Sequence, residues 1–235
     1  MARSRAPRII RHILKLLLVL IILVVSGLLF WRVCASEDYE ITKGITVNEQ
    51  VKAAYAEYGD GLILQYQKDR ATITKAEKNY GYFSVVEYVY LPQIKQLQLV
   101  FRYNNSTLEH LKADYALSEI PNRETDLYDL TLTLTTDLTP EDPSDNLQQD
   151  KLQSHRIHAS SEPVRETTTL YNYRRYTFDN VDIKPETVGV FLDIYYVGDV
   201  NYDLDAYGTL LLYDRSAPWV PYELSSDELK RLKGE

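Results

Sequence analysis

The chain has 235 residues and a formal net charge of −8, with 26 lysines and arginines against 34 aspartates and glutamates. Residues 1–35 hold six of the basic residues and no acid, so residues 36–235 carry a charge of −14. This acidic segment is a poor candidate for nucleic-acid binding, because contacts to phosphate need clustered lysine and arginine. It favours cations or basic partners, unless the charge serves solubility alone. Cys34 is the only cysteine, so an intramolecular disulfide is excluded.

The first predicted element is a transmembrane helix over residues 13–33. The run from Leu16 to Trp31 is almost wholly apolar, and with the flanking basic side chains reaching outwards it approaches the ~20 residues that a bilayer requires. Five basic residues precede the run and acidic residues follow it closely. The positive-inside rule therefore predicts a cytoplasmic tail at residues 1–12 and an extracytoplasmic domain after the span, in a single-pass protein of the cell membrane.

A cleaved signal peptide is the alternative interpretation of this segment. Val33, Cys34 and Ala35 form a small-x-small pattern that would allow cleavage after Ala35. The apolar run exceeds the ~7–15 residues of a signal peptide's hydrophobic region, which favours an uncleaved signal-anchor. Both interpretations leave the acidic domain outside the cytoplasm.

Residues 34–60 are predicted to form a stalk followed by a short helix. Thr46 and Glu49 have the spacing of a capping box. Apolar residues follow at helical spacing until Gly59, which predicts a helix over residues 47–58.

The sequence from 61 to 222 alternates between apolar and polar residues, as strands with one buried face do. The clearest strand places Tyr128, Leu130, Leu132 and Leu134 on the inner face. Strands are predicted over residues 62–66, 82–90, 96–103, 128–135, 152–159, 168–178, 188–196 and 207–213. Because the helices are too few and too short to cover a parallel sheet, the pattern predicts a mainly β domain, an antiparallel and immunoglobulin-like two-sheet β-sandwich.

Two further capping boxes predict short accessory helices. Ser106 and Glu109 have this spacing between two of the predicted strands. Ser225 and Glu228 have it at the start of a C-terminal helix and tail, residues 223–235.

Two patterns are candidates for metal binding. His155 and His158 are three residues apart on a predicted strand and point to opposite faces, which favours solvent-facing histidines over shared zinc ligands. The second candidate is a calcium loop, in which alternate oxygen ligands wrap one cation. Its ligands would be Asp199, Asn201, Asp203 and Asp205. Leu204 and Leu210 stand where such a loop has its glycine and its closing glutamate, so an acidic connection without Ca²⁺ is the alternative.

Tyrosine is unusually frequent, with 20 residues against five phenylalanines. Its broad ring and polar tip suit protein and sugar surfaces. The predicted binding residues are Tyr171, Tyr173, Arg174, Arg175 and Tyr176. The expected partners are membrane lipid around residues 13–33 and an envelope protein or polysaccharide at the tyrosine-rich surface. The alternative is that tyrosine replaces phenylalanine at strand positions that lie between core and solvent.

Part of the outer domain resembles uncharacterised single-pass membrane proteins of clostridial-type Gram-positive bacteria. The resemblance rests on FRYNNSTLEHLKADYALSEIP at residues 101–121 and DLYDLTLTLTTDLTPEDPSDN at residues 126–146. It implies an envelope setting, and it implies no activity and no site residues.

The sequence contains no Gly-x-Ser-x-Gly, Ser-x-x-Lys or His-Glu-x-x-His motif. The predicted function is therefore a non-enzymatic, membrane-anchored binding or scaffolding domain of unknown ligand, without a cofactor. One alternative is a cell-envelope hydrolase that uses paired carboxylates brought together by folding. The other is an accessory subunit of a larger membrane complex, in which Ser26 and Gly27 allow a second helix to approach closely.

Overall fold

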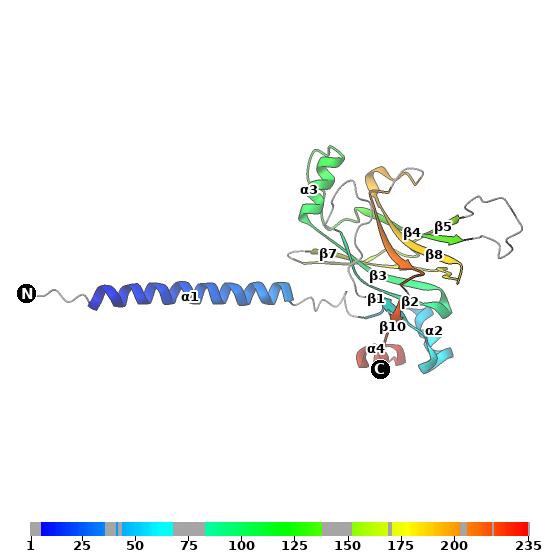
Figure 1. Cartoon of the computed structure of the whole chain (residues 1–235), viewed down its shortest axis with the longest axis horizontal. Helices are drawn as coiled ribbons and strands as arrows, with labels where there is room; N and C mark the ends of the chain where they lie inside the picture. The colour runs from blue at the N-terminus through cyan, green and yellow to red at the C-terminus, as the bar shows by residue number, and fades with distance from the viewer. Residues whose placement is uncertain are drawn as a thin grey trace, which may run out of the picture. The chain divides into compact units, whose positions relative to one another are not determined.

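The computed structural model describes residues 6–35, 41, 44–67, 83–137, 152–168, 171–202, 206–217 and 219–234 (Figure 1). The chain divides into two compact units, Met1–Lys43 and Gly44–Glu235. All of the described strands lie in the second unit.

The first unit contains one long helix, α1 (Ala6–Ala35). Its stretch Ile13–Phe30 is long and apolar enough to cross a membrane. At 1.5 Å per residue the 30 residues of α1 extend about 45 Å, more than the ~30 Å of a bilayer's hydrocarbon core. The large apolar side chains between Ile13 and Phe30 are exposed, so this stretch has no face buried within the protein. The predicted spanning helix is thus present as a helix of sufficient length, and its orientation stays a prediction.

Two antiparallel sheets form the second unit. The six-stranded sheet has the order β10 (Val220–Pro221), β1 (Gln65–Gln67), β2 (Ser84–Leu91), β3 (Gln96–Asn104), β7 (Tyr171–Phe178) and β6 (Val164–Thr167). The four-stranded sheet has the order β5 (Leu152–His158), β4 (Tyr128–Asp137), β8 (Thr187–Tyr196) and β9 (Gly208–Asp214). The prediction of a mainly β, two-sheet antiparallel sandwich is confirmed.

Among the described residues of this unit, three short helices accompany the sheets. They are α2 (Glu49–Tyr58), α3 (Asn105–Asp114) and α4 (Ser226–Lys233). Short 3₁₀ turns lie at Gly59–Gly61, Pro92–Ile94 and Val197–Asp199.

The main core lies between the two sheets and is built from the inward-facing residues of each strand. Tyr128, Leu130, Leu132 and Leu134 of β4 all belong to it, as the alternation predicts. Leu132 pairs with Leu192 of β8 on one side and with Ile157 of β5 on the other, so apolar side chains meet across three strands. Such cross-strand pairs fix the register, because a slip by one residue would turn every apolar side chain outwards.

The chain crosses from one sheet to the other along both sides of the sandwich. The edge strand β5 is followed after five residues by β6 of the other sheet, and β9 is followed in the same way by β10. The second crossing contains Trp219, whose Nε1 donates to the carbonyl of Leu212 at 2.8 Å and whose ring contacts Tyr88 and Tyr90. The sequence did not predict β6 and β10, because strands of four and two residues are too short to show an alternating pattern.

A second, smaller core covers the outer face of the six-stranded sheet. It joins α2 and α4 to β2, and its buried members are Ile45, Val51, Ala54, Leu62, Leu64, Val89, Leu91 and Leu232. Because of this added layer, β3 is buried on both faces: Gln96 and Gln98, which point away from the main core, are 0% and 2% exposed. The expectation of a half-buried β3 is therefore wrong.

Two of the three predicted capping boxes are also wrong. Asn48, not Thr46, caps α2 and accepts a hydrogen bond from the backbone N–H of Val51 at 2.9 Å. Asn104, not Ser106, caps α3. The third prediction is confirmed, because Ser225 caps α4 and forms a capping box with Glu228.

Candidate functional site

The five predicted binding residues lie on β7, between β3 and β6. Tyr176 belongs to the main core, whereas Tyr173 and Arg175 point to the opposite face because side chains alternate along a strand. Tyr173, Arg174 and Tyr176 are 1%, 1% and 4% exposed, and Arg175 is 8% exposed. The half-buried Tyr171 lies beneath the guanidinium of Arg102, 4.3 Å from the ring centre. These side chains therefore do not form one exposed surface.

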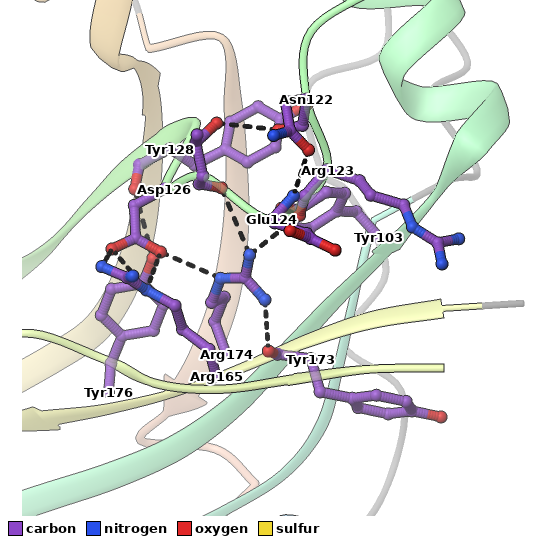
Figure 2. A network of polar contacts seen from close by, with 11 residues as sticks. Tyr103, Asn122, Arg123, Glu124, Asp126, Tyr128, Arg165, Tyr173, Arg174 and Tyr176 are labelled. Atoms are coloured by element: carbon purple, nitrogen blue, oxygen red, sulfur yellow. Dashed lines mark hydrogen bonds and ion pairs between the residues drawn. The ribbon is translucent and has the colours of Figure 1, made fainter. Parts of the chain in front are cut away.

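Arg174 joins β7 to the connection between α3 and β4 (Figure 2). Its Nε donates to Oδ1 of Asp126 at 3.0 Å, and its Nη1 donates to the carbonyl of Tyr173 at 2.8 Å. Its Nη2 donates to the carbonyls of Arg123 and Thr125 at 3.0 and 3.2 Å. A buried guanidinium with this many partners stabilises the connection and has little capacity left for a ligand.

Asp126 receives a second arginine from the edge strand β6. Arg165 donates through Nε to both carboxylate oxygens of Asp126, at 2.9 and 3.0 Å, and also through Nη2. Tyr128 and Tyr176 belong to the main core, and burial raises the pKa of both phenols above its ordinary value. Both hydroxyls therefore stay protonated at neutral pH. The Asp126–Arg165–Arg174 cluster therefore has a structural role, because it links β6 and β7 to the connection between α3 and β4.

A groove of about 340 Å³ lies elsewhere, on the outer face of the six-stranded sheet. One wall is formed by residues 46–50 at the start of α2, and the other by residues 160–164, where the chain crosses from β5 to β6. Its floor includes Arg175 and Thr177 of β7 and the following Asp179. Of the predicted binding residues, only Arg175 lines this groove.

Two buried glutamines of β3 hold the groove's first wall. The side-chain amide of Gln98 accepts from the Thr46 N–H at 2.6 Å and donates to the Thr46 carbonyl at 3.0 Å. Gln96 donates to the side chains of Gln50 and Asp179, both at 2.8 Å, and accepts from Gln98 at 2.8 Å. A buried polar network with its partners satisfied fixes the groups that it contacts.

The second wall is fixed to β7 by backbone and side-chain hydrogen bonds. The Ser160 N–H donates to the carbonyl of Thr177 at 2.8 Å, and the Ser160 hydroxyl accepts from the Asp179 N–H at 2.7 Å. Both walls of the groove are therefore held before any ligand arrives, which lowers the entropy cost of binding.

The lining of the groove offers mixed hydrogen-bonding groups. Hydroxyls come from Thr46, Ser160, Ser161 and Thr177, amides from Asn48 and Gln50, and carboxylates from Glu49, Glu162 and Asp179. Arg175 adds a guanidinium, which also donates to the carbonyl of Gly44. This arrangement suits a polar ligand that carries both donors and acceptors, such as hydroxyl or amide groups.

The groove was missed at the level of sequence. Its only local signal is the uncharged polar pair Gln96 and Gln98 at outward positions of β3, and an exposed strand tolerates the same residues. The segments that form the walls are more than 100 residues apart in the chain, and only the crossing from β5 to β6 brings them together.

The two histidines of β5 lie as predicted. Both are exposed, and His155 pairs with the inward-facing Leu134 whereas His158 pairs with Thr131, so the two rings are on opposite faces. The ring of His158 contacts Tyr202 with a centroid separation of 5.0 Å.

The calcium prediction is only partly covered by the described residues. Asp199 ends a 3₁₀ turn and Asn201 follows it, whereas Asp203 and Asp205 lie outside the described residues. Within the part of the chain that the structure describes, no three His, Cys, Asp or Glu side chains are grouped so that they could hold a metal ion. A calcium loop at residues 199–205 stays a prediction.

Comparisons of the chain with protein-family models, with curated proteins and with solved structures found no match. The resemblance to clostridial-type membrane proteins therefore stays a prediction.

Proposed function

We propose that this protein is a membrane-anchored, extracytoplasmic binding domain that takes a polar segment of an envelope polymer in the groove beside β7. The observation that carries the proposal is the groove itself, whose walls are held by the buried pair Gln96 and Gln98. A volume of about 340 Å³ is within the usual range of small-ligand sites. The lining supplies donors and acceptors beside apolar surface such as the exposed side chain of Val164, which favours a glycan or an amide-bearing chain, because such a ligand carries both polar groups and apolar faces.

The test is the binding of soluble cell-wall fragments from a Gram-positive bacterium to the full-length protein in detergent micelles. We expect Gln50→Ala and Glu162→Ala each to weaken binding about tenfold, or ~1.4 kcal/mol, because each removes a polar group from the lining. Glu119→Ala is the matched control, an exposed acidic residue outside the groove. Equal affinities for all four proteins, with unchanged melting temperatures, would contradict the proposal.

A cell-envelope hydrolase is the second candidate, and the three carboxylates of the groove favour it. Glycoside hydrolysis needs one carboxyl group that stays protonated, usually in an apolar setting, and a second that is ionised. Asp179 instead accepts a hydrogen bond from Gln96 at 2.8 Å, so its setting in the groove is polar and not apolar. Release of new reducing ends from the same fragments, abolished by Glu162→Gln and by Asp179→Asn, would establish the hydrolase and exclude a purely binding role.

The outside placement of the domain has a separate test in intact cells. Cys34 is replaced by serine, and single cysteines are then introduced at the exposed positions Glu119 and Lys230 or, as a control, at Ser4. We expect a membrane-impermeant maleimide to label the first two without lysis and Ser4→Cys only after lysis. The reverse pattern would overturn the orientation. An intact mass equal to that of residues 36–235 would establish signal-peptide cleavage after Ala35.

A further inference from the structure

The strand β5 (Leu152–His158) forms one edge of the four-stranded sheet. Within the described residues it pairs with β4 alone, over seven consecutive residues without a register shift. Six of its seven side chains are exposed, including Leu152 at 57%. An edge strand of this kind presents a row of backbone N–H and C=O groups to which another strand can pair.

The other three edges of the two sheets are each protected in a way that β5 is not. β10 has only two residues, one of them Pro221, and β6 has four, with Arg165 bound to Asp126. The pairing of β9 with β8 shifts register between Val190 and Phe191, which twists that edge. β5 contains no proline, no lysine and no bulge, which are three of the usual devices against strand pairing.

The charge of β5 is opposite to that of the domain around it. Its only formally charged side chain is Arg156, and it holds two histidines and no acid, whereas residues 36–235 as a whole carry −14 with histidine counted as neutral. The guanidinium of Arg156 lies 5.3 Å from the ring centre of Tyr202 and 5.9 Å from that of Tyr195, which holds it on the outer face of the sheet. A strand added beside β5 would have its side chains next to these basic groups.

We propose that the free edge of β5 binds an extended, acidic segment of a partner protein, which adds to the four-stranded sheet as a fifth strand. Main-chain hydrogen bonds supply affinity in this mode, and the alternating side chains supply specificity. A second copy of this chain is a poorer occupant, because two β5 edges would bring basic groups together. The inference rests on the edge and its charge, and it is independent of the groove beside β7.

The test uses three labelled octapeptides and the full-length protein in detergent micelles. The first alternates glutamate with valine, the second alternates lysine with valine, and the third is the first with N-methyl groups on its two central residues. Adjacent residues of a strand point their N–H groups to opposite edges, so the third peptide cannot pair across its centre in either orientation. We expect the glutamate peptide to bind at least about tenfold more tightly than the other two.

Substitutions on the protein separate the edge from the general charge. Arg156→Glu should weaken binding of the glutamate peptide about tenfold. Lys230→Glu, the same charge change at a side chain that is 62% exposed on α4, which packs on the six-stranded sheet, should change it less than about twofold. If Arg156→Glu lowers the melting temperature, His155→Glu replaces it. The proposal is overturned if the N-methylated or the lysine peptide binds equally well, if no peptide binds saturably up to about 1 mM, or if sedimentation shows a dimer that Arg156→Glu dissociates.

Discussion

Replacing Glu228 by glutamine tests how the C-terminal helix α4 is fastened to the start of the domain. Glu228 is 1% exposed, and its Oε1 accepts from the Ile45 N–H at 2.8 Å and from the Tyr222 hydroxyl at 2.7 Å. Its Oε2 accepts from the backbone N–H of Ser225 at 2.7 Å and from the Ser225 hydroxyl at 2.6 Å. All four partners donate, so the carboxylate is an acceptor on both of its oxygens.

A glutamine side chain has one oxygen and one NH₂ group in place of the two oxygens. Whichever way it is oriented, the backbone N–H of either Ile45 or Ser225 then faces an N–H donor. An unsatisfied buried donor costs about 1–3 kcal/mol, and the remaining bonds lose the ionic part of their strength. We expect the free energy of unfolding to fall by about 2–4 kcal/mol, which for a domain of about 190 residues corresponds to roughly 5–15 °C in melting temperature.

The assay is urea unfolding in detergent micelles, followed by the fluorescence of Trp219 with Trp31 replaced by phenylalanine in every variant. Asp227→Asn is the matched control on the same turn of α4, since the Asp227 side chain is 88% exposed and forms an ion pair with Lys230 at 3.5 Å. We expect its effect to stay within about 0.5 kcal/mol. Equal losses for the two variants, or a loss below about 0.5 kcal/mol for Glu228→Gln, would refute the reasoning.

The pH dependence of the same experiment has a defined sign. Burial alone would raise the pKa of Glu228, but the hydrogen bonds from Ser225, Tyr222 and Ile45 outweigh it and lower the pKa. A lowered pKa in the folded state means that the carboxylate stabilises the fold above the pKa of an unfolded glutamate, and that this contribution is lost as the pH falls through the folded value. The difference between the parent and Glu228→Gln should therefore be largest near neutral pH and shrink below about pH 4.

Four further substitutions test other contacts by thermal unfolding. Arg174→Met should cost about 3 kcal/mol, because it removes the buried donor to three carbonyls and leaves Asp126 with only one of its two arginines, Arg165. A loss below about 1 kcal/mol would show that Arg174 is dispensable for stability. Asn104→Ala should lower the free energy of unfolding by about 1 kcal/mol through loss of the helix cap, whereas Ser106→Ala should change it little. A larger loss for Ser106→Ala than for Asn104→Ala would show that Ser106 is the cap. Gly44→Ala should cost about 2–4 kcal/mol, because the φ of Gly44 is +65° and an added Cβ would lie 2.0 Å from the Glu228 carboxylate; an unchanged melting temperature would contradict this.

The pattern of apolar residues determined the class of fold. The alternation at residues 128–135 placed Tyr128, Leu130, Leu132 and Leu134 in the core, where they lie. A period of two is a direct consequence of strand geometry, so it can be read from one segment without knowing its neighbours. The apolar run of α1, interrupted only by Ser26 and Gly27, was equally local, because the length of a helix follows from its residue count.

Helix caps were decided partly by contacts from distant segments. Thr46 has the right spacing for a cap, but both of its backbone groups bond to Gln98 of β3, 52 residues away, and Asn48 caps α2 instead. At Ser225 no such competitor intervenes, and the capping box formed as predicted. A local motif therefore predicts a cap only where no distant partner competes for the same groups.

The candidate sites depended on tertiary structure almost entirely. The sequence grouped Tyr173, Arg174 and Tyr176 as one surface. In the structure these residues lie on β7, between β3 and β6, and their side chains are buried on both faces of the sheet. The groove brings together residues 46–50 and 160–164, and the free edge of β5 follows from the order of strands in its sheet. The sequence by itself determined which residues alternate and which span is apolar, because these are properties of neighbouring residues. Which polar side chains are accessible was decided only by the pairing of distant strands.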